Sequence, residues 1–261
     1  MKKAIRTILL IVCICVFCYS AYNLINIYLN YKKIDDDYGE LANTYTSVKD
    51  EKKEEQNYLQ IDWATLKERN NDVKAWIQIP DTNVNYPVLQ GETNDTYIHS
   101  DIDHQKLSAG SIFVDCRNEK PFEDFNTVIY GHNMKNGSMF NNIKSYTDQS
   151  FADGHPYVYI YLPDGTVSQY KVVVGHIISE SSVLYSTQIV DTASFVQEMV
   201  KTSSIKVDFD QSQVQSVITL STCTSAGSES GKRNVVHAIL QRKGIDPVKE
   251  KMEIFGSIDK A

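Results

Sequence analysis

Basic residues are scarce in this 261-residue sequence once its first 33 residues are set aside. That segment contains five of the 26 lysines and arginines and no acidic residue, which leaves 21 basic residues against 33 acidic ones in the rest of the chain. So acidic a body does not have the clustered lysines and arginines that bind phosphate backbones. Nucleic acid is therefore not expected as a partner.

Cysteine is scarce outside the same segment. Cys13, Cys15 and Cys18 lie in the apolar N-terminal run, where we interpret them as small lipid-facing residues, and Cys116 and Cys223 lie in the body. Two cysteines in so long a body do not make a disulfide framework. A single bridge between these two stays open as an alternative, and it would prevent Cys223 from acting as a nucleophile.

One long hydrophobic run is present, at residues 7–29. It is long enough to cross a bilayer, which takes about 20 apolar residues. Residues 1–6 form a short tail with Lys2, Lys3 and Arg6, and these charges favour a cytoplasmic N-terminus with the body of the protein outside the cell. We expect an uncleaved single-pass signal-anchor. A cleaved signal peptide is the alternative, although Cys18-Tyr19-Ser20 is a poor cleavage site and the run extends past it.

Residues 30–70 are predicted to form N-terminal helices. Over residues 35–57 the apolar residues of one helical stripe recur at spacings of four and three: Ile34, Tyr38, Leu41, Tyr45 and Val48. This stripe fits a stalk, a pairing helix or a helix packed on the body. A second, shorter helix is predicted over residues 62–69, with Asp62 as its N-cap.

From residue 71 to residue 245 the sequence predicts a mainly β fold, with no internal repeat and no low-complexity tract. Seven or eight short strands with few helices indicate a closed or nearly closed β-barrel. The expected strands are 76–79, 84–89, 111–114, 127–130, 157–162, 166–178, 214–222 and 234–242. Helical spacing appears at residues 138–146 and, inside the long connection before the last pair of strands, at residues 192–203. Residues 246–261 are expected to be a C-terminal tail.

Three side chains suited to acyl transfer follow or begin predicted strands. Cys223 ends one strand, Arg233 begins the next after a turn-rich loop, and His132 follows an earlier strand with only Gly131 between. Two consecutive runs joined by a turn pair antiparallel, so the thiol and the guanidinium should lie at the same end of a sheet.

These residue types match the needs of nucleophilic catalysis by a cysteine. A free thiol is only a few per cent ionised at neutral pH, so a base or a nearby cation must activate it. Histidine exchanges protons near neutrality, and arginine offers fixed donors to the oxyanion of a tetrahedral intermediate. Cys223, His132 and Arg233 are therefore the candidate catalytic residues.

The motifs around these residues resemble those of the sortases, specifically class B. They are T-L-S-T-C with an arginine ten positions on, I-Y-G-H-N upstream, and W-I-Q-I-P-D-T-N-V-N-Y-P-V-L-Q-G before them. The resemblance covers about residues 71–240, and the predicted helix at 192–203 is similar to the insertion that distinguishes class B from class A.

The resemblance implies a membrane-anchored transpeptidase on the outer face of Gram-positive bacteria. Such an enzyme cuts a C-terminal sorting signal after threonine, forms a thioacyl intermediate on Cys223, and passes the acyl group to a peptidoglycan amine. His132 would be the general acid and base, and Arg233 would hold substrate carbonyls and the oxyanion. The resemblance also suggests substrate-binding or histidine-supporting positions, which are Asn94, Tyr130, Ser221 and Thr222.

Several alternatives stay open from the sequence. A cysteine peptidase uses the same chemistry with water as the acceptor, a pilin-polymerising sortase uses a protein lysine, and a tethered binding module would have an inert Cys223. Cys116 is a rival thiol with less suitable partners. Residues 99–104 contain two histidines and two aspartates in no closed zinc pattern, so neither a metal nor another cofactor is expected.

Overall fold

The computed structural model describes residues 2–48 and 58–247. The chain divides into two units, Met1–Glu40 and Leu41–Ala261. The first unit is part of helix α1 (Lys2–Tyr45), whose most apolar stretch has a mean hydropathy of 2.4. By length and composition this helix is able to cross a membrane.

The prediction of a helix over residues 35–57 is wrong at residues 46–48. Strand β1 (Thr46–Val48) follows at once and pairs antiparallel with β2 (Leu59–Ile61). β-Branched residues such as Thr46 and Val48 lose side-chain freedom in a helix, and here they find a partner strand instead. Residues 49–57 of the predicted helix lie outside the described residues, as do residues 248–261 of the expected tail.

Helix α2 (Trp63–Arg69) confirms the second predicted helix. The Asp62 side chain accepts a hydrogen bond from the Thr65 backbone amide at 3.1 Å, as an N-cap should, and Leu66 is fully buried.

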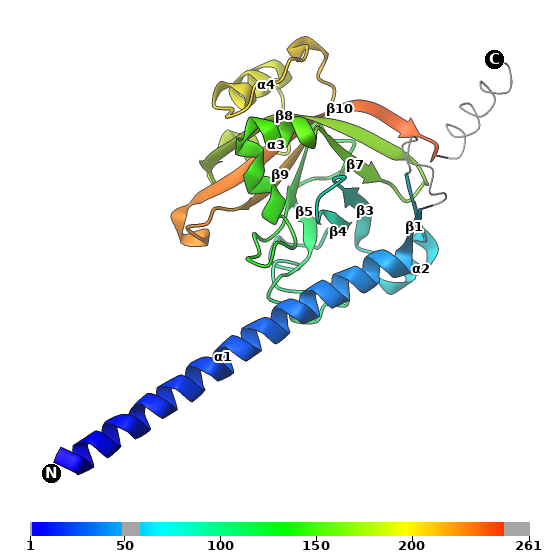
Figure 1. The fold of residues 1–261 in the computed structure, drawn as a ribbon. Coiled ribbons are helices and arrows are strands. Elements are labelled where there is room, and N and C mark those ends of the chain that lie inside the picture. Colours follow the sequence, from blue (N-terminus) through cyan, green and yellow to red (C-terminus); the bar gives the residue numbers. More distant parts are fainter. Residues whose placement is uncertain (1, 49–57, 248–261) are drawn as a thin grey trace, which may run out of the picture. The chain divides into compact units, whose positions relative to one another are not determined.

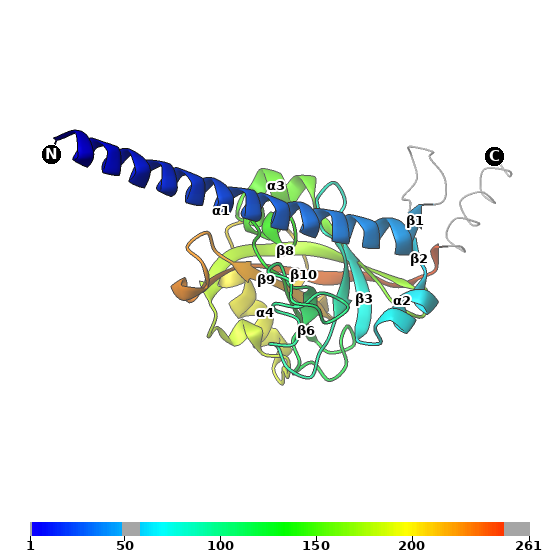
Figure 2. The ribbon, with the colours of Figure 1, turned by 90° about the horizontal axis from the view of Figure 1, so that it is seen from below.

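Eight strands form the predicted closed barrel, in the order β10-β8-β7-β3-β4-β5-β6-β9 (Figure 1). Neighbouring strands are antiparallel except for β4 with β5 and β6 with β9, which are parallel. The strands are β3 (Val73–Gln78), β4 (Asn85–Leu89), β5 (Ile112–Val114), β6 (Asn126–Tyr130), β7 (Tyr157–Tyr161), β8 (Val167–Ser179), β9 (Val217–Cys223) and β10 (Lys232–Ile245). Figure 2 shows the two longest strands, β8 and β10, running side by side.

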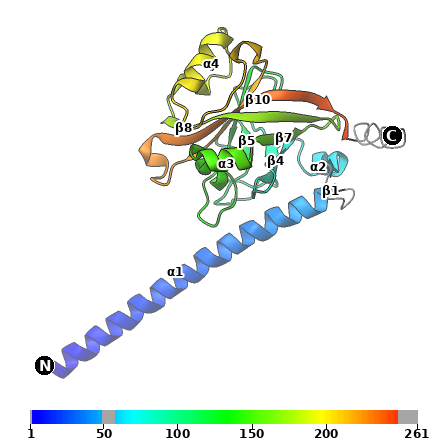
Figure 3. The same cartoon turned by 45° about the horizontal axis from the view of Figure 1, so that its top comes forward.

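The connection from β8 to β9 carries α4 (Thr192–Lys201), as predicted, between the 3-10 turns η2 (Val183–Tyr185) and η3 (Gln211–Gln213). Asp191 caps this helix through the Ser194 amide. Its apolar residues, including Phe195 and Met199, pack on Val217 and Ile239 of the barrel. Figures 1 and 3 both show α4 outside the barrel against the β8–β10 side.

Two shorter helical segments precede β7. The helix predicted at 138–146 is instead the 3-10 helix η1 (Asn141–Thr147), and the short helix α3 (Gln149–Gly154) was not predicted. Asp148 lies between them and caps α3 through the Phe151 amide at 3.0 Å. A six-residue helix is too short to show a clear apolar period, so its cap is its main sequence signal.

A chain of buried hydrogen bonds lies beneath α4. Thr202 contacts His176 Nδ1 at 3.0 Å, His176 Nε2 contacts His237 Nε2 at 3.1 Å, and His237 Nδ1 contacts Thr219 Oγ1 at 2.9 Å. Thr219 donates to Asn126 Oδ1 at 2.7 Å. Because Thr219 uses its hydrogen for Asn126, it accepts a hydrogen bond from His237 Nδ1. His237 Nε2 then accepts from His176 Nε2, and His176 Nδ1 accepts from Thr202, so each imidazole has one donor and one acceptor bond in its neutral form.

Candidate active site

The ends of β6, β9 and β10 bring the three candidate catalytic residues to one rim of the barrel. In the parallel pair β6–β9, Tyr130 lies opposite Ser221, and the Gly131 amide continues the ladder to the Ser221 carbonyl at 3.2 Å. In the antiparallel pair β9–β10, Arg233 lies opposite Cys223. His132, two residues beyond Tyr130, therefore reaches the level of Cys223.

The β9–β10 pair directs Cys223 and Arg233 to one face. Alternate residues of a strand share a face, so Cys223 lies on the face of Ser221, and Arg233 lies on the face of Val235. The Ser221 hydroxyl is 2.7 Å from the Tyr185 hydroxyl, and Val235 packs in one cluster with Tyr185. This is the outer face of the barrel, beside η2.

Gly131 is required at the step from β6 to His132. A Cβ on this residue would lie 2.4 Å from the Ile112 side chain and 2.8 Å from the Phe140 ring, closer than packed atoms tolerate. Glycine thus allows the strand to lie against Ile112 and Phe140 while its neighbour His132 turns outward.

The imidazole of His132 is held by the segment before β5. Its Nε2 lies 2.7 Å from the Ile98 carbonyl, and its ring stacks on His99 with 5.4 Å between centroids. A carbonyl only accepts, so Nε2 carries the hydrogen, and the neutral ring has its free lone pair on Nδ1. Burial lowers the pKa of His132; the hydrogen bond to Ile98 opposes this shift and His99 adds to it.

Cys223 is partly exposed, and its thiol is free rather than bridged to Cys116. Two side-chain amides fix its backbone, because Asn133 and Asn234 both donate to the Cys223 carbonyl, at 2.9 and 3.1 Å. Asn133 directly follows His132, so this contact ties the histidine segment to the cysteine strand. Sequence reasoning did not identify either asparagine as part of the site. The only indication in the sequence is their position, since Asn133 directly follows His132 and Asn234 directly follows Arg233.

The guanidinium of Arg233 forms an ion pair with Glu180, which sequence reasoning also missed. It also donates to the carbonyls of Ser228 and Lys232, at 3.3 and 3.0 Å. Tyr185 lies in the field of the same groups. Burial raises the pKa of Tyr185 to about 12; the bond to Ser221 and the charge of Arg233 oppose this shift, and the neighbouring Glu180 and Cys223 add to it.

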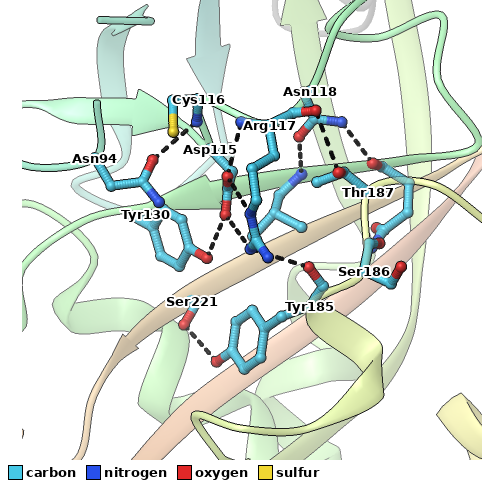
Figure 4. A network of polar contacts seen from close by, with 12 residues as sticks. Asn94, Asp115, Cys116, Arg117, Asn118, Tyr130, Tyr185, Ser186, Thr187 and Ser221 are labelled. Carbon is cyan, nitrogen blue, oxygen red and sulfur yellow. Dashed lines mark hydrogen bonds and ion pairs between the residues drawn. The ribbon is translucent and has the colours of Figure 1, made fainter. Parts of the chain in front are cut away.

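A network of polar contacts lies beside Tyr130 and Tyr185 on this face (Figure 4). Asp115 is fully buried and accepts hydrogen bonds from Arg117, and its Oδ2 accepts one from the Tyr130 hydroxyl at 2.8 Å. Arg117 also donates to the Tyr185 carbonyl at 3.3 Å. Burial opposes the ionised form of Asp115, but these donors outweigh it and hold the pKa of the carboxyl below its usual value.

The four predicted substrate-binding residues fall in different environments. Asn94 accepts from the Cys116 amide at 2.8 Å, and Tyr130 stacks on Tyr185 with 6.2 Å between ring centroids. Figure 4 shows both beside Asp115, with Ser221 bonded to Tyr185. Thr222 lies on the opposite face of β9 from Cys223, and the residue is 2% exposed, so its position does not favour a direct substrate contact.

Residues 99–104 do not gather around one point. Asp103 forms an ion pair with Arg69 at 2.6 Å, Asp101 accepts two backbone amides of its own loop, and His104 lies against Tyr97. Within residues 2–48 and 58–247, no group of three or more histidine, cysteine, aspartate or glutamate side chains could hold a metal ion.

Comparison with known proteins agrees with this geometry. The model of the sortase domain family matches residues 77–241, more than half of the chain. The chain is 36% identical over 187 residues to sortase B of Listeria monocytogenes, covering 68% of this chain and 73% of that protein. It is 30% identical over 236 residues to sortase B of Staphylococcus aureus, covering 88% and 93%.

Solved structures give the same result. The crystal structure of S. aureus sortase B matches with a TM-score of 0.65 at 29% identity, covering 82% of this chain and 98% of that one. A complex of S. aureus sortase B with substrate matches with a TM-score of 0.63 at 32% identity, covering 69% and 84%. A complex of sortase B with triglycine matches with a TM-score of 0.62 at 33% identity, covering 69% and 85%.

The barrel, with cysteine, histidine and arginine at one rim, therefore defines a cysteine transpeptidase. The chain belongs to the sortase family, and the relatives that it matches are class B sortases.

Proposed function

We propose that this enzyme cleaves a C-terminal sorting signal after threonine and transfers the protein, through a thioacyl intermediate on Cys223, to a peptidoglycan amine. The observation that carries the proposal is the convergence of β6, β9 and β10, which places Cys223 beside the residue pair His132–Asn133 and opposite Arg233. The complexes of sortase B with substrate and with triglycine support a sorting-signal donor and an amine acceptor.

The first half-reaction uses the free lone pair of His132. Nδ1 takes the thiol proton of Cys223, and the sulfur attacks the carbonyl carbon of the scissile amide. The guanidinium of Arg233 stabilises the resulting oxyanion. When the intermediate collapses, the carbon–nitrogen bond breaks, the leaving amine takes the proton from His132, and the thioester remains on Cys223.

The second half-reaction reverses these roles. The acceptor amine attacks the thioester carbonyl, His132 removes a proton from the attacking nitrogen, and the oxyanion forms again beside Arg233. Collapse breaks the carbon–sulfur bond and returns the proton to the cysteine. His132 hydrogen-bonds to a main-chain carbonyl rather than to a carboxylate, and Thr224 and Ser225 follow Cys223, so this mechanism uses no aspartate-assisted triad.

Three of the suggested binding residues line or support the face on which this chemistry takes place. We assign Asn94, Tyr130 and Ser221 to the substrate-binding side, because each belongs to the network beneath Tyr185 or contacts it. We assign Thr222 no substrate contact, since its side chain is buried on the other face of β9.

One experiment tests the reaction. The enzyme is incubated with a small library of sorting peptides, with and without an amine nucleophile, and the mixture is analysed by mass spectrometry. We expect a thioacyl adduct on Cys223 and an amide product that requires the amine. A hydrolysed peptide with no amide product would instead identify a cysteine peptidase, and the absence of any adduct would leave a binding module.

A further inference from the structure

The guanidinium of Arg233 is held in place by its surroundings before any substrate is present. Its Nη1 donates to the carbonyls of Ser228 and Lys232, and its Nη2 pairs with Glu180 Oε2. The Ser228 carbonyl belongs to the loop that leads into β10, and Lys232 is the first residue of that strand. The charged partner comes from a different part of the chain, namely the turn after β8.

The backbone of Glu180 is itself fixed beside that loop. Ser179, the last residue of β8, pairs with Lys232, and the Glu180 amide donates to the Gly231 carbonyl at 2.9 Å. The carboxylate therefore projects from a hydrogen-bonded position next to Arg233, not from a free loop. The same turn begins the long connection that contains η2 and Tyr185.

The ion pair lies at the strand position next to the nucleophile, because Arg233 of β10 pairs directly with Cys223 of β9. Two residues earlier on β9, the Ser221 hydroxyl contacts the Tyr185 hydroxyl on the same outer face. The side chain of Arg233 is 19% exposed, whereas that of Glu180 is 53% exposed. An ion pair this exposed adds little to folding stability. Its main effect is therefore on the position of the Arg233 guanidinium.

We propose that Glu180 is a positioning residue for Arg233: it holds the guanidinium in the orientation that receives the oxyanion formed at Cys223. This inference rests on the proposed function, because it assumes that Arg233 stabilises that oxyanion. A guanidinium stabilises the oxyanion only when its N–H groups point at the oxygen on which the charge develops. Fixing it in advance removes the need to order a long side chain during the reaction.

The test measures peptide–amine ligation kinetics for the wild-type enzyme, Glu180→Gln, Glu180→Asp and Glu229→Gln. Displacement of a catalytic group by about 1 Å costs up to about a hundredfold in rate, so we expect Glu180→Gln to lower kcat by about tenfold to a hundredfold. KM should change much less. Glu180→Asp keeps the charge and should recover part of the loss.

Glu229 provides the matched control. It lies in the 3-10 turn η4 (Ser228–Ser230), close in sequence to Arg233, and it forms no ion pair with any residue that the structure describes. Glu229→Gln removes the same charge and should stay within about twofold of the wild-type rate. Circular dichroism and thermal melts of all variants establish that they are folded.

A double-mutant cycle separates positioning from a general structural role. In an Arg233→Ala background there is no guanidinium to orient, so adding Glu180→Gln should produce no further loss. An additional loss of the same size in that background would overturn the proposal. A rise in kcat for Glu180→Gln would also overturn it, because the glutamate would then restrain the arginine away from the reaction.

The failure of this inference differs from the failure of the proposed function. If Arg233→Ala is strongly impaired and Glu180→Gln behaves like the wild type, only the role of Glu180 is wrong. If the wild-type enzyme forms no thioacyl adduct, or Arg233→Ala is fully active, the proposed use of Arg233 is itself wrong.

Discussion

Single residues around His132 set its proton chemistry. The Ile98 carbonyl fixes the hydrogen on Nε2, and the ring of His99 stacks on the imidazole. Both burial and His99 lower the pKa of His132, so the ring stays neutral, and able to act as a base, to a lower pH than an ordinary histidine.

His99→Phe should therefore change the pH profile of the enzyme. The substitution keeps an aromatic ring against His132 but removes the imidazole that lowers the pKa of His132, so this pKa should rise. We expect the acid limb of kcat/KM to move to higher pH while the maximum rate changes little. An unchanged acid limb, measured against His155→Phe as a control, would show that the stacked ring does not tune this histidine.

Cys223→Ala should abolish ligation and thioacyl formation without unfolding the protein. The cysteine is partly exposed, and the contacts that fix it are made to its carbonyl, which alanine retains. We expect a loss of at least about 10³-fold in kcat with a melting temperature close to that of the wild type. Cys116→Ala is the matched control and should remain active.

The candidate site was only partly predictable from residues. Cys223, His132 and Arg233 occur in motifs, and their strand-end positions follow from local patterns. The partners that hold them, Glu180 and Asn133 among them, are set by strand register, and one glutamate in a turn looks like any other in the sequence. Nor did the sequence indicate that Thr222 would be buried, because the motif carries no information about which face is inside.

At the scale of elements, the buried histidine pair joins β8, β9 and β10 beneath α4. Burial lowers the pKa of His176 to about 4, and the pKa of His237 falls well below its ordinary value through burial and the nearby His176. Unfolded histidines bind protons near pH 6.5, so the unfolded state binds more protons between pH 6.5 and about pH 4. Stability is therefore lost as the pH falls through this range.

Urea unfolding at pH 7, 5.5 and 4.5 should show this loss. His176 alone accounts for about 2 kcal/mol between the extremes. The double variant His176→Gln, His237→Gln should be less stable at pH 7, but its free energy of unfolding should fall less steeply toward pH 4.5. An equally steep fall would place the acid sensitivity elsewhere in the barrel.

Asp115 has a comparable role between β5, β6 and η2. Asp115→Ala leaves Arg117 and Tyr130 without their shared acceptor, so we expect a loss of about 1.5–3 kcal/mol in the free energy of unfolding. Activity should also fall, since Tyr130 precedes Gly131-His132. Asp208 is an exposed acid, and Asp208→Asn is the control. If Asp115→Ala lowered the free energy of unfolding no more than this control does, the supporting role of the network would be contradicted.

The elements themselves were predictable where the sequence pattern is long. All eight barrel strands and α4 follow from β-branched runs and helical spacing. The exceptions are local. Helix α1 ends at Tyr45 because the next residues pair with β2, and β2 lies beyond the segment that the helical stripe covers. The segment predicted as a helix at 138–146 forms the seven-residue 3-10 helix η1 instead.

For the whole molecule, we propose that residues 7–29 anchor the protein in a membrane with the N-terminus in the cytoplasm. The supporting observation is that α1 combines sufficient length and hydropathy with basic residues at its start. The full chain should fractionate with membranes, and protease added outside intact cells should digest the body. A chain that begins at Leu41 should be soluble and should still ligate peptides. Release of the full chain by a carbonate wash would contradict the anchor.

The parallel pairing of β6 with β9 has a consequence for how the protein gains activity. The two strands are joined only through the long stretch of chain that contains β7, β8 and α4, and contacts so distant in sequence form slowly. Cys223 and His132 therefore cannot come together on a partly folded intermediate in which β9 has not paired with β6. During refolding from denaturant, catalytic turnover should therefore return no sooner than the final closure of the barrel.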